Sequence, residues 1–146
     1  MRPDGTVSNT QPLSDGVGGI PENTLASNAQ FGTAIEAGAG DLNGDGLRDV
    51  LVLSRHMSAV FILHMNVDDT VQSVRQLSTA SGGGFESLGV SGLNGVNFGI
   101  AALSPRQPGN PVDLVMTDYN NFRLIFARLH ANGTVIDGSV ETVSNG

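Results

Sequence analysis

Short apolar runs separated by turn-forming residues follow one another along most of the chain. Helix-forming residues with an apolar period of 3.6 are not found in these runs, whose length and flanks are typical of β-strands. The pattern therefore predicts an all-β fold with two groups of four strands. The expected strands are residues 32–37, 49–54, 59–65 and 70–77, then 99–103, 112–117, 122–129 and 134–143.

The two groups are copies of one repeat with a constant step along the chain. Asp68-Asp69-Thr70-Val71 returns as Asn132-Gly133-Thr134-Val135, and Asp49-Val50-Leu51-Val52 returns at the same separation as Asp113-Leu114-Val115-Met116. Phe31-Gly32 returns as Phe98-Gly99, out of step with the others, so the loops of the two copies differ in length. The repeat divides the chain at residues 15–80 and 81–146.

An earlier occurrence of the same turn opens the chain. Asp4-Gly5-Thr6-Val7 precedes Asp68-Asp69-Thr70-Val71 by the step that separates Asp49 from Asp113. Residues 1–14 are therefore predicted to supply an additional outer strand, at 6–13, that pairs with a neighbouring blade.

The inner strands of each copy are apolar on both faces. This holds for Val50-Leu51-Val52-Leu53, Val60-Phe61-Ile62-Leu63 and Leu124-Ile125-Phe126-Ala127, whereas the fourth strand of the first copy, residues 71–77, is far more polar. In a sheet with one solvent-exposed face, apolar and polar residues would alternate along each strand. Both faces of these inner strands are therefore expected to be covered. Four-stranded antiparallel sheets of this kind, stacked face to face, are the blades of a β-propeller.

One segment has the spacing of a cation-binding loop. Residues 40–49 read Gly-Asp-Leu-Asn-Gly-Asp-Gly-Leu-Arg-Asp, with oxygen-bearing side chains at alternate positions and glycine at the sharp turn. Oxygen ligands with three carboxylates suit Ca²⁺ better than zinc or copper. A polar turn rich in Asp, Asn and Gly is the simpler alternative. The predicted ligands are the side chains of Asp41, Asn43, Asp45 and Asp49 and the carbonyl of Leu47.

Two other families of calcium loop do not fit. An EF-hand needs a Glu at the twelfth position, between two helices, and that position is Val52 in an apolar strand. Dockerin modules repeat at a much shorter spacing and follow the loop with a helix.

The first copy resembles an FG-GAP repeat of integrin α-subunits and bacterial surface proteins. The resemblance lies in four features: Phe31-Gly32, the loop at 40–49, the turn at 68–71 and Gly83-Gly84-Phe85. The resemblance implies a propeller, usually of seven blades, with Ca²⁺ between the first and second strands of some blades. It also implies adhesion or ligand binding at an extracellular or cell-surface location. The second copy departs from the pattern: Pro105, Gln107, Gly109 and Asp113 lie opposite the four side-chain ligands, so only the last carboxylate is kept, and this copy is expected to hold no metal.

Charge and composition exclude several classes of partner and chemistry. The chain has 14 acidic and 7 basic residues, a net charge of −7 and no cysteine. Nucleic acid and anionic membranes would be repelled, and disulfides and thiolate chemistry are excluded. We predict no signal peptide and no membrane insertion, because no apolar segment of the required length is present.

No catalytic constellation can be assembled, so we predict that the chain is not an enzyme. None of the three histidines, His56, His64 and His130, has the spacing of a metal site or triad, and the last two are expected at equivalent turns after the third strands. The remaining functions are a scaffold or adhesion module that binds a protein, and a lectin that binds a glycan. Sugar sites stack a pyranose on aromatic rings, and this chain leaves only Tyr119 and Phe122 as the main exposed candidates, so the lectin is the alternative to the scaffold. The phenylalanines at 31, 61, 98 and 126 are expected in the core.

Two blades cannot close a propeller, since closure takes about 4 to 8. Two apolar sheet faces would remain bare. The chain is therefore either part of a longer propeller or a homo-oligomer joined head to tail, with three chains as the favoured number.

Overall fold

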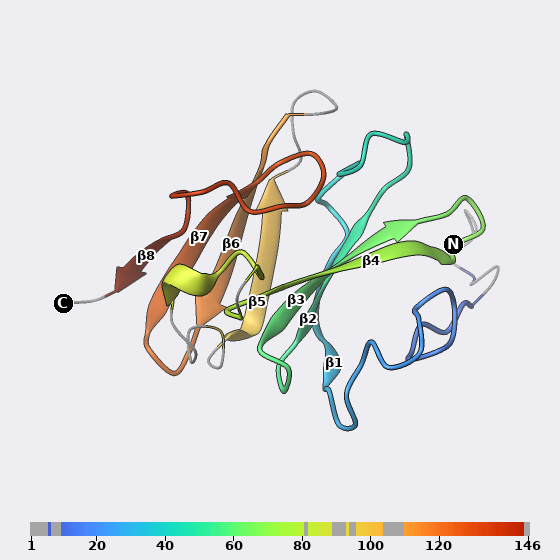
Figure 1. The fold of residues 1–146 in the computed structure, drawn as a ribbon, viewed down its shortest axis with the longest axis horizontal. Helices are drawn as coiled ribbons and strands as arrows, with labels where there is room; N and C mark the ends of the chain where they lie inside the picture. The colour runs from blue at the N-terminus through green and yellow to red at the C-terminus, as the bar shows by residue number, and fades with distance from the viewer. Residues whose placement is uncertain are drawn as a thin grey trace.

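The computed structural model describes residues 6, 10–80, 82–88, 93, 96–103 and 110–144, and they form two four-stranded antiparallel sheets (Figure 1). The predicted all-β class and the two groups of four strands are confirmed. The first sheet consists of β1 (Phe31–Glu36), β2 (Val50–Ser54), β3 (Ala59–Met65) and β4 (Val71–Ser78). The second consists of β5 (Val96–Leu103), β6 (Val112–Asp118), β7 (Arg123–Leu129) and β8 (Glu141–Ser144).

Helix is almost absent from the described residues. The one helical element among them is a three-residue 3-10 turn, Glu86–Leu88. The part of the chain that is described therefore holds no helix of the length and apolarity that crossing a membrane requires.

The two sheets repeat one another in strand register. Leu51 pairs with Ile62 across β2 and β3, and their counterparts in the second copy, Val115 and Phe126, pair across β6 and β7. Because side chains alternate along a strand, equal register places equivalent residues on equivalent faces of the two sheets. The predicted repeat is thus present in space as well as in sequence.

The turn between the third and fourth strands is built identically in both copies. Asn66 N–H donates to the Thr70 carbonyl at 2.8 Å, and His130 N–H donates to the Thr134 carbonyl at 2.7 Å. The counterpart of His130 is therefore Asn66, and the prediction that His64 and His130 occupy equivalent turns is wrong. His64 lies inside β3, where its side chain is buried.

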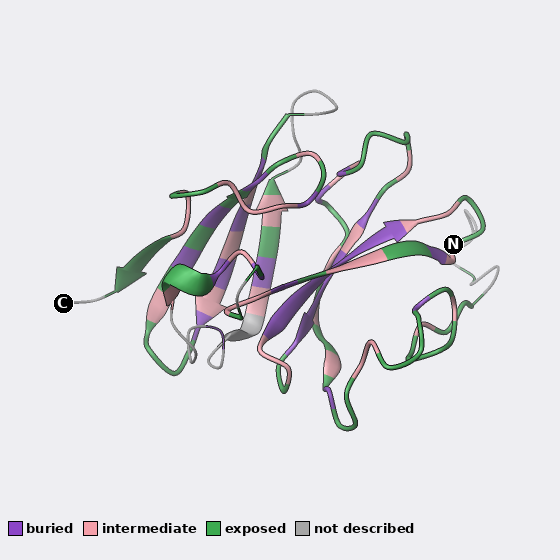
Figure 2. Ribbon diagram, viewed as in Figure 1, coloured by how far each residue is buried: buried purple, intermediate pink, exposed green. Residues whose placement is uncertain are grey.

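The main core lies between the sheets. It holds side chains of β2 and β3, such as Leu51 and Ile62, against Met116 and Ile125 of the second sheet, together with Phe85 of the connecting segment. The sheets approach most closely along β1 and β5 (Figures 1 and 2). Apolar side chains thus make the two sheets one packed unit.

Residues 13–29 cover the other face of the first sheet. Ile20 is 2 % exposed and packs with Phe61, Leu63 and Val71. The Gly18 carbonyl accepts a hydrogen bond from Val71 N–H at 2.8 Å. Of the two apolar faces predicted to be bare, this one is therefore closed by the chain itself, on the side away from the second sheet (Figure 1).

The terminal strands differ from their predicted bounds. An additional outer strand was expected at residues 6–13, but its described residues, Thr6 and 10–13, belong to no strand. The last strand is shorter than predicted, at 141–144, because Val135 makes only a single bridge to Leu129 before the chain loops outward.

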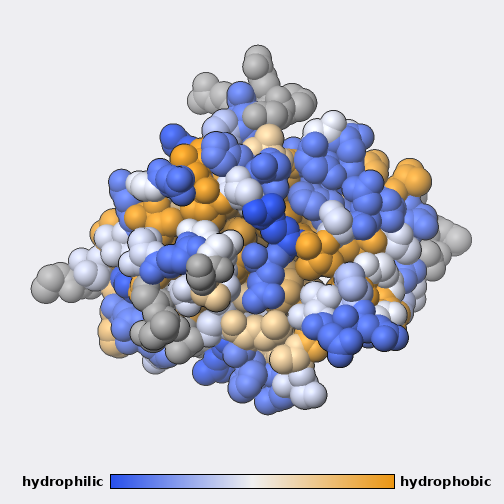
Figure 3. All heavy atoms as spheres, in the orientation of Figure 1, coloured by the Kyte–Doolittle hydropathy of each residue, from blue (hydrophilic) through white to orange (hydrophobic). Residues whose placement is uncertain are grey.

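The outer face of the second sheet remains open. β2 and β3 are buried on both faces as predicted, but on β7 the side chains of Leu124 and Phe126 are 39 % and 36 % exposed. The expected covering of residues 124–127 on both sides is therefore wrong, as is the placement of Phe126 in the core. Apolar residues reach the surface over this sheet, at the upper left of Figure 3.

The other phenylalanines expected in the core lie mostly in the first sheet. Phe61 is fully buried, and Phe31 packs against it edge to face with ring centroids 5.5 Å apart. The side chain of Phe98 lies outside the described part of the structure. The prediction therefore holds for Phe61 and for the partly buried Phe31.

Candidate functional site

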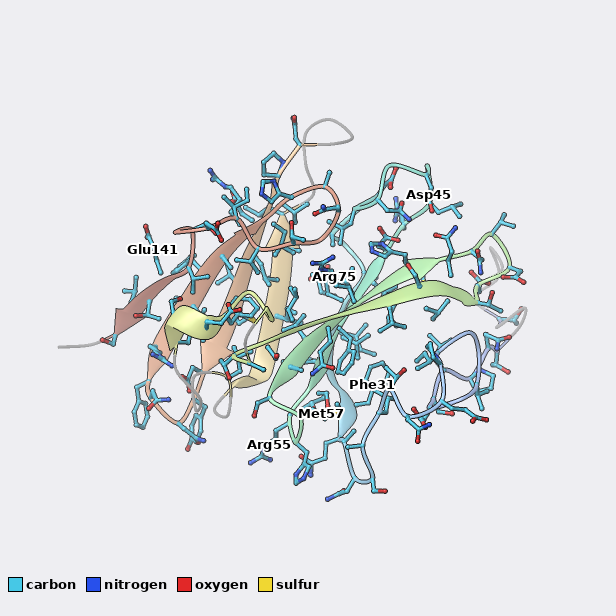
Figure 4. All side chains as sticks on the ribbon, viewed as in Figure 1. Phe31, Asp45, Arg55, Met57, Arg75 and Glu141 are labelled. Carbon is cyan, nitrogen blue, oxygen red and sulfur yellow. The ribbon has the colours of Figure 1, made fainter. Side chains whose placement is uncertain are left out.

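The predicted calcium loop joins β1 to β2 and projects from the end of the first sheet. Asp49 N–H donates to the Gly40 carbonyl at 2.8 Å and closes the base of the loop. Gly44 and Gly46 have φ angles of 84° and 86°, which only glycine adopts without cost, so they allow the chain to curl. Asp45 lies at the outer part of this loop (Figure 4).

The carboxylate of Asp41 is turned into the loop. Its Oδ1 accepts hydrogen bonds from the backbone N–H groups of Gly44 at 2.6 Å and Asp45 at 3.1 Å, and its Oδ2 accepts one from Gly46 at 2.8 Å. These bonds fix both the side chain and the loop backbone around it.

Asn43 and Asp45 continue the same arrangement. Asn43 Oδ1 accepts from Asp45 N–H at 3.1 Å, and Asn43 Nδ2 donates to Asp45 Oδ2 at 2.9 Å. The Leu47 N–H donates to Asp45 Oδ1 at 2.8 Å. That bond, the Asn43 amide and the nearby His64 lower the pKa of Asp45, so its carboxylate is ionised at neutral pH.

Asp49 has a different position from the other three side chains. It is fully buried, its Oδ2 accepts from Leu42 N–H at 2.7 Å, and its Oδ1 accepts from Met65 N–H at 3.2 Å. The carboxylate thereby ties the base of the loop to the end of β3.

His64 is the neighbour of Asp49 that the sequence reasoning missed. Its Nδ1 lies 3.1 Å from Asp49 Oδ2, a close approach without the alignment of a hydrogen bond. The strand register would have revealed this neighbour. Val50 pairs with Leu63 across β2 and β3, so the residue before Val50, Asp49, lies beside the residue after Leu63, His64.

The donor chemistry of the loop fits a hard cation, since Asp41, Asn43 and Asp45 offer only oxygen ligands. No group of three His, Cys, Asp or Glu side chains is gathered for a metal anywhere in the described ranges. Asp49 sits at the base with both oxygens engaged, while the three remaining side chains lie in the exposed loop. The Leu47 carbonyl is the further ligand that the spacing predicts.

The second copy replaces this arrangement with an ion pair. Asp113, the counterpart of Asp49, accepts from Arg128 Nε at 2.6 Å and from Arg128 Nη2 at 3.3 Å. Arg128 is the counterpart of His64, and both partners of its pair are about half exposed, at 56 % and 46 %. The other three replaced positions, 105, 107 and 109, lie outside the described residues.

An aromatic pair occupies the turn between β6 and β7. Tyr119 and Phe122 are 58 % and 73 % exposed, as predicted, and their ring centroids are 5.9 Å apart. Beneath them, buried Asp118 accepts from Arg123 Nε at 2.7 Å and from Asn121 Nδ2 at 2.8 Å. Sequence reasoning found the rings but not this polar group, because a lone Asp at a strand end gives no signal of burial.

Comparison with protein-family models, with curated proteins and with solved structures finds no match for this chain. The resemblance to FG-GAP repeats thus remains one of motif and spacing.

Proposed function

We propose that the chain is a calcium-binding β-propeller repeat module that serves as an adhesion or protein-binding scaffold. The observation that carries the proposal is the loop at 41–49, in which backbone N–H groups hold the oxygens of Asp41 and Asp45 in fixed positions. Side chains that the loop backbone already holds lose less conformational freedom when they bind Ca²⁺.

Electrostatics support a cation at this loop. Asp41, Asp45 and Asp49 place three carboxylates in one short loop, and carboxylates at this spacing repel one another. Asp41 Oδ2 and Asp45 Oδ1 each accept one backbone N–H donor and so keep a second lone pair. A divalent cation would use these lone pairs and remove the repulsion, which stabilises the loop.

The propeller part of the proposal is supported by the way the two sheets stack. They share one register, they pack face to face, and they approach most closely along their first strands, β1 and β5. Blades that radiate from a central axis have this arrangement, with the first strand of each blade innermost. The scaffold role follows from the loops that such blades present at their ends.

Thermal unfolding with and without Ca²⁺ tests the proposal. We expect Ca²⁺ to raise the midpoint, EGTA to return it, and Asp45→Ala to abolish the response, because a ligand that binds only the folded state stabilises it. Asp137→Ala, which removes an exposed carboxylate from the second copy, is the matched control and should respond like the unmodified chain. Equal midpoints with Ca²⁺ and with EGTA would refute the calcium site.

A second candidate function is glycan binding at Tyr119 and Phe122. Two exposed rings in contact, with the Asp118–Arg123 pair beside them in the same cleft, combine a stacking surface with polar groups. A glycan array with the unmodified chain and with Phe122→Ser would detect it. Binding that Phe122→Ser leaves unchanged would exclude this cleft.

A further inference from the structure

The second sheet has an apolar face whose counterpart in the first sheet is covered. In the first sheet, Leu51, Val60 and Ile62 are fully buried in the core between the sheets. Their counterparts in the second copy are Val115, Leu124 and Phe126. Since the strand registers are the same, these residues form the equivalent face of the second sheet.

This outer face is defined by the cross-strand pairs that share it. Leu124 pairs with Val143, Phe126 with Glu141, and Val115 with both Phe126 and Ala101. Leu103 and Val143 are 68 % and 58 % exposed. The outer face therefore consists of an apolar centre with charged residues at one end: Ala101, Leu103, Val115, Leu124, Phe126 and Val143, then Asp113, Arg128 and Glu141.

The repeat itself shows what kind of surface fits this face. In the first sheet, the equivalent positions pack against side chains of a four-stranded sheet, among them Leu114, Met116 and Ile125. A second four-stranded sheet with an apolar face is therefore the occupant that the repeat indicates. Two grooves are lined in part by this face, one by Leu124 and Val143 next to the Tyr119–Phe122 turn and one by Leu103 and Phe126. Side chains of the occupant would fit there.

The opposite end of the stack is already occupied. Residues 13–29 seal the far face of the first sheet through Ile20, and the segment is fastened by Asp15, which accepts from Asn23 N–H at 3.0 Å and Leu25 N–H at 2.9 Å. A head-to-tail ring would have to displace this segment. For an assembly of identical chains that leaves it in place, the outer face of the second sheet is the apolar sheet face that stays open among the described residues.

We propose that this outer face is the self-contact of a two-fold symmetric dimer of the chain. When each copy contributes the same patch, the contact closes at two copies and leaves no bare apolar sheet. The charged end carries both signs, with Arg128 beside Asp113, so a two-fold copy can place arginine opposite carboxylate. This inference does not depend on the calcium site, since the loop at 41–49 belongs to the other sheet.

Sedimentation velocity of the full chain over about a hundredfold range of concentration tests the dimer, because its population follows mass action. Phe126→Lys is the decisive variant. In a monomer the lysine lies on an open surface directly across from Glu141, a favourable cross-strand pair, so the fold is kept. In a dimer the lysine is buried, and we expect self-association about a hundredfold weaker.

The matched control is Val67→Lys, at an apolar side chain that is 88 % exposed in the turn before β4 and does not belong to the outer face. We expect it to dimerise like the unmodified chain, and circular dichroism should show that both variants are folded. A chain that stays monomeric at every concentration would overturn the inference. So would a trimer, which would support the head-to-tail ring, or a dimer that Phe126→Lys leaves unchanged.

Discussion

His64 Nδ1 lies 3.1 Å from the carboxylate of Asp49, and both side chains are buried at the base of the candidate calcium loop. The same two strand positions in the second sheet hold Arg128 and Asp113, which form an ion pair at the surface. One repeat thus carries the same acid and base positions in two environments. Their difference in burial can be measured as a difference in stability.

Asp49→Ala is expected to destabilise the fold far more than Asp113→Ala. The first leaves the buried N–H of Leu42 and the partly buried N–H of Met65 without an acceptor and costs about 3 kcal/mol. The second breaks an exposed ion pair and costs less than about 1 kcal/mol. Urea unfolding without added Ca²⁺ measures both. Equal losses would contradict the role of Asp49 as a buried anchor.

Calcium should bind with a stoichiometry of about one ion per chain. The first copy offers Asp41, Asn43 and Asp45 in its loop, whereas the second keeps only Asp113, whose carboxylate is paired with Arg128. Isothermal titration calorimetry gives the number directly. We expect affinity at the weak end of protein sites, with a dissociation constant of about 10⁻⁴ to 10⁻³ M if the protein is extracellular. Two equivalent sites would show that the second loop also binds.

Gly19→Ala should destabilise the chain by about 2 to 4 kcal/mol, from left-handed strain plus steric overlap. Gly19 has φ of 91°, and an added Cβ would lie 2.0 Å from the backbone oxygen of Val71. Gly138→Ala is the control, since Gly138 has φ of 72° but open space around it, and should cost about 1 kcal/mol. Comparable losses in urea unfolding would show that residues 13–29 do not pack on β4 as described.

Asp15 should titrate below the usual aspartate range. Hydrogen bonds from Leu25 N–H and Asn23 N–H lower its pKa. A lowered folded pKa contributes stability that is present above the unfolded value of about 4 and is lost as pH falls through the folded value. The destabilisation by Asp15→Asn should therefore shrink as acid is added. NMR titration of the carboxyl carbon checks the direction, and an ordinary midpoint would contradict it.

The positions of most strands and the repeat were predictable because they depend on local pattern. Alternation, turn residues and the constant step between copies are all visible in a single sequence, and the equal registers of β2–β3 and β6–β7 follow from them. The exposure of Phe126 was not predictable, because an apolar residue in a strand reads the same whether a neighbour covers it or not.

The start of the chain shows the limit of a motif. Residues 4–7 repeat the turn before β4, so a strand was expected at 6–13, yet its described residues, 6 and 10–13, lie in no strand, because pairing depends on a partner strand that a turn motif does not specify. The packing of Ile20 onto Phe61 comes instead from an irregular segment, in which periodicity carries no signal.

Because residues 13–29 close one face of the first sheet and the outer face of the second is open, the stack of sheets has a direction. A further repeat unit fused after β8 could pack directly on the open apolar face of the second sheet. A unit placed on the other side would first have to detach Ile20 from its packing. Lengthening of this architecture, by gene duplication or by design, is therefore expected to proceed from one side only.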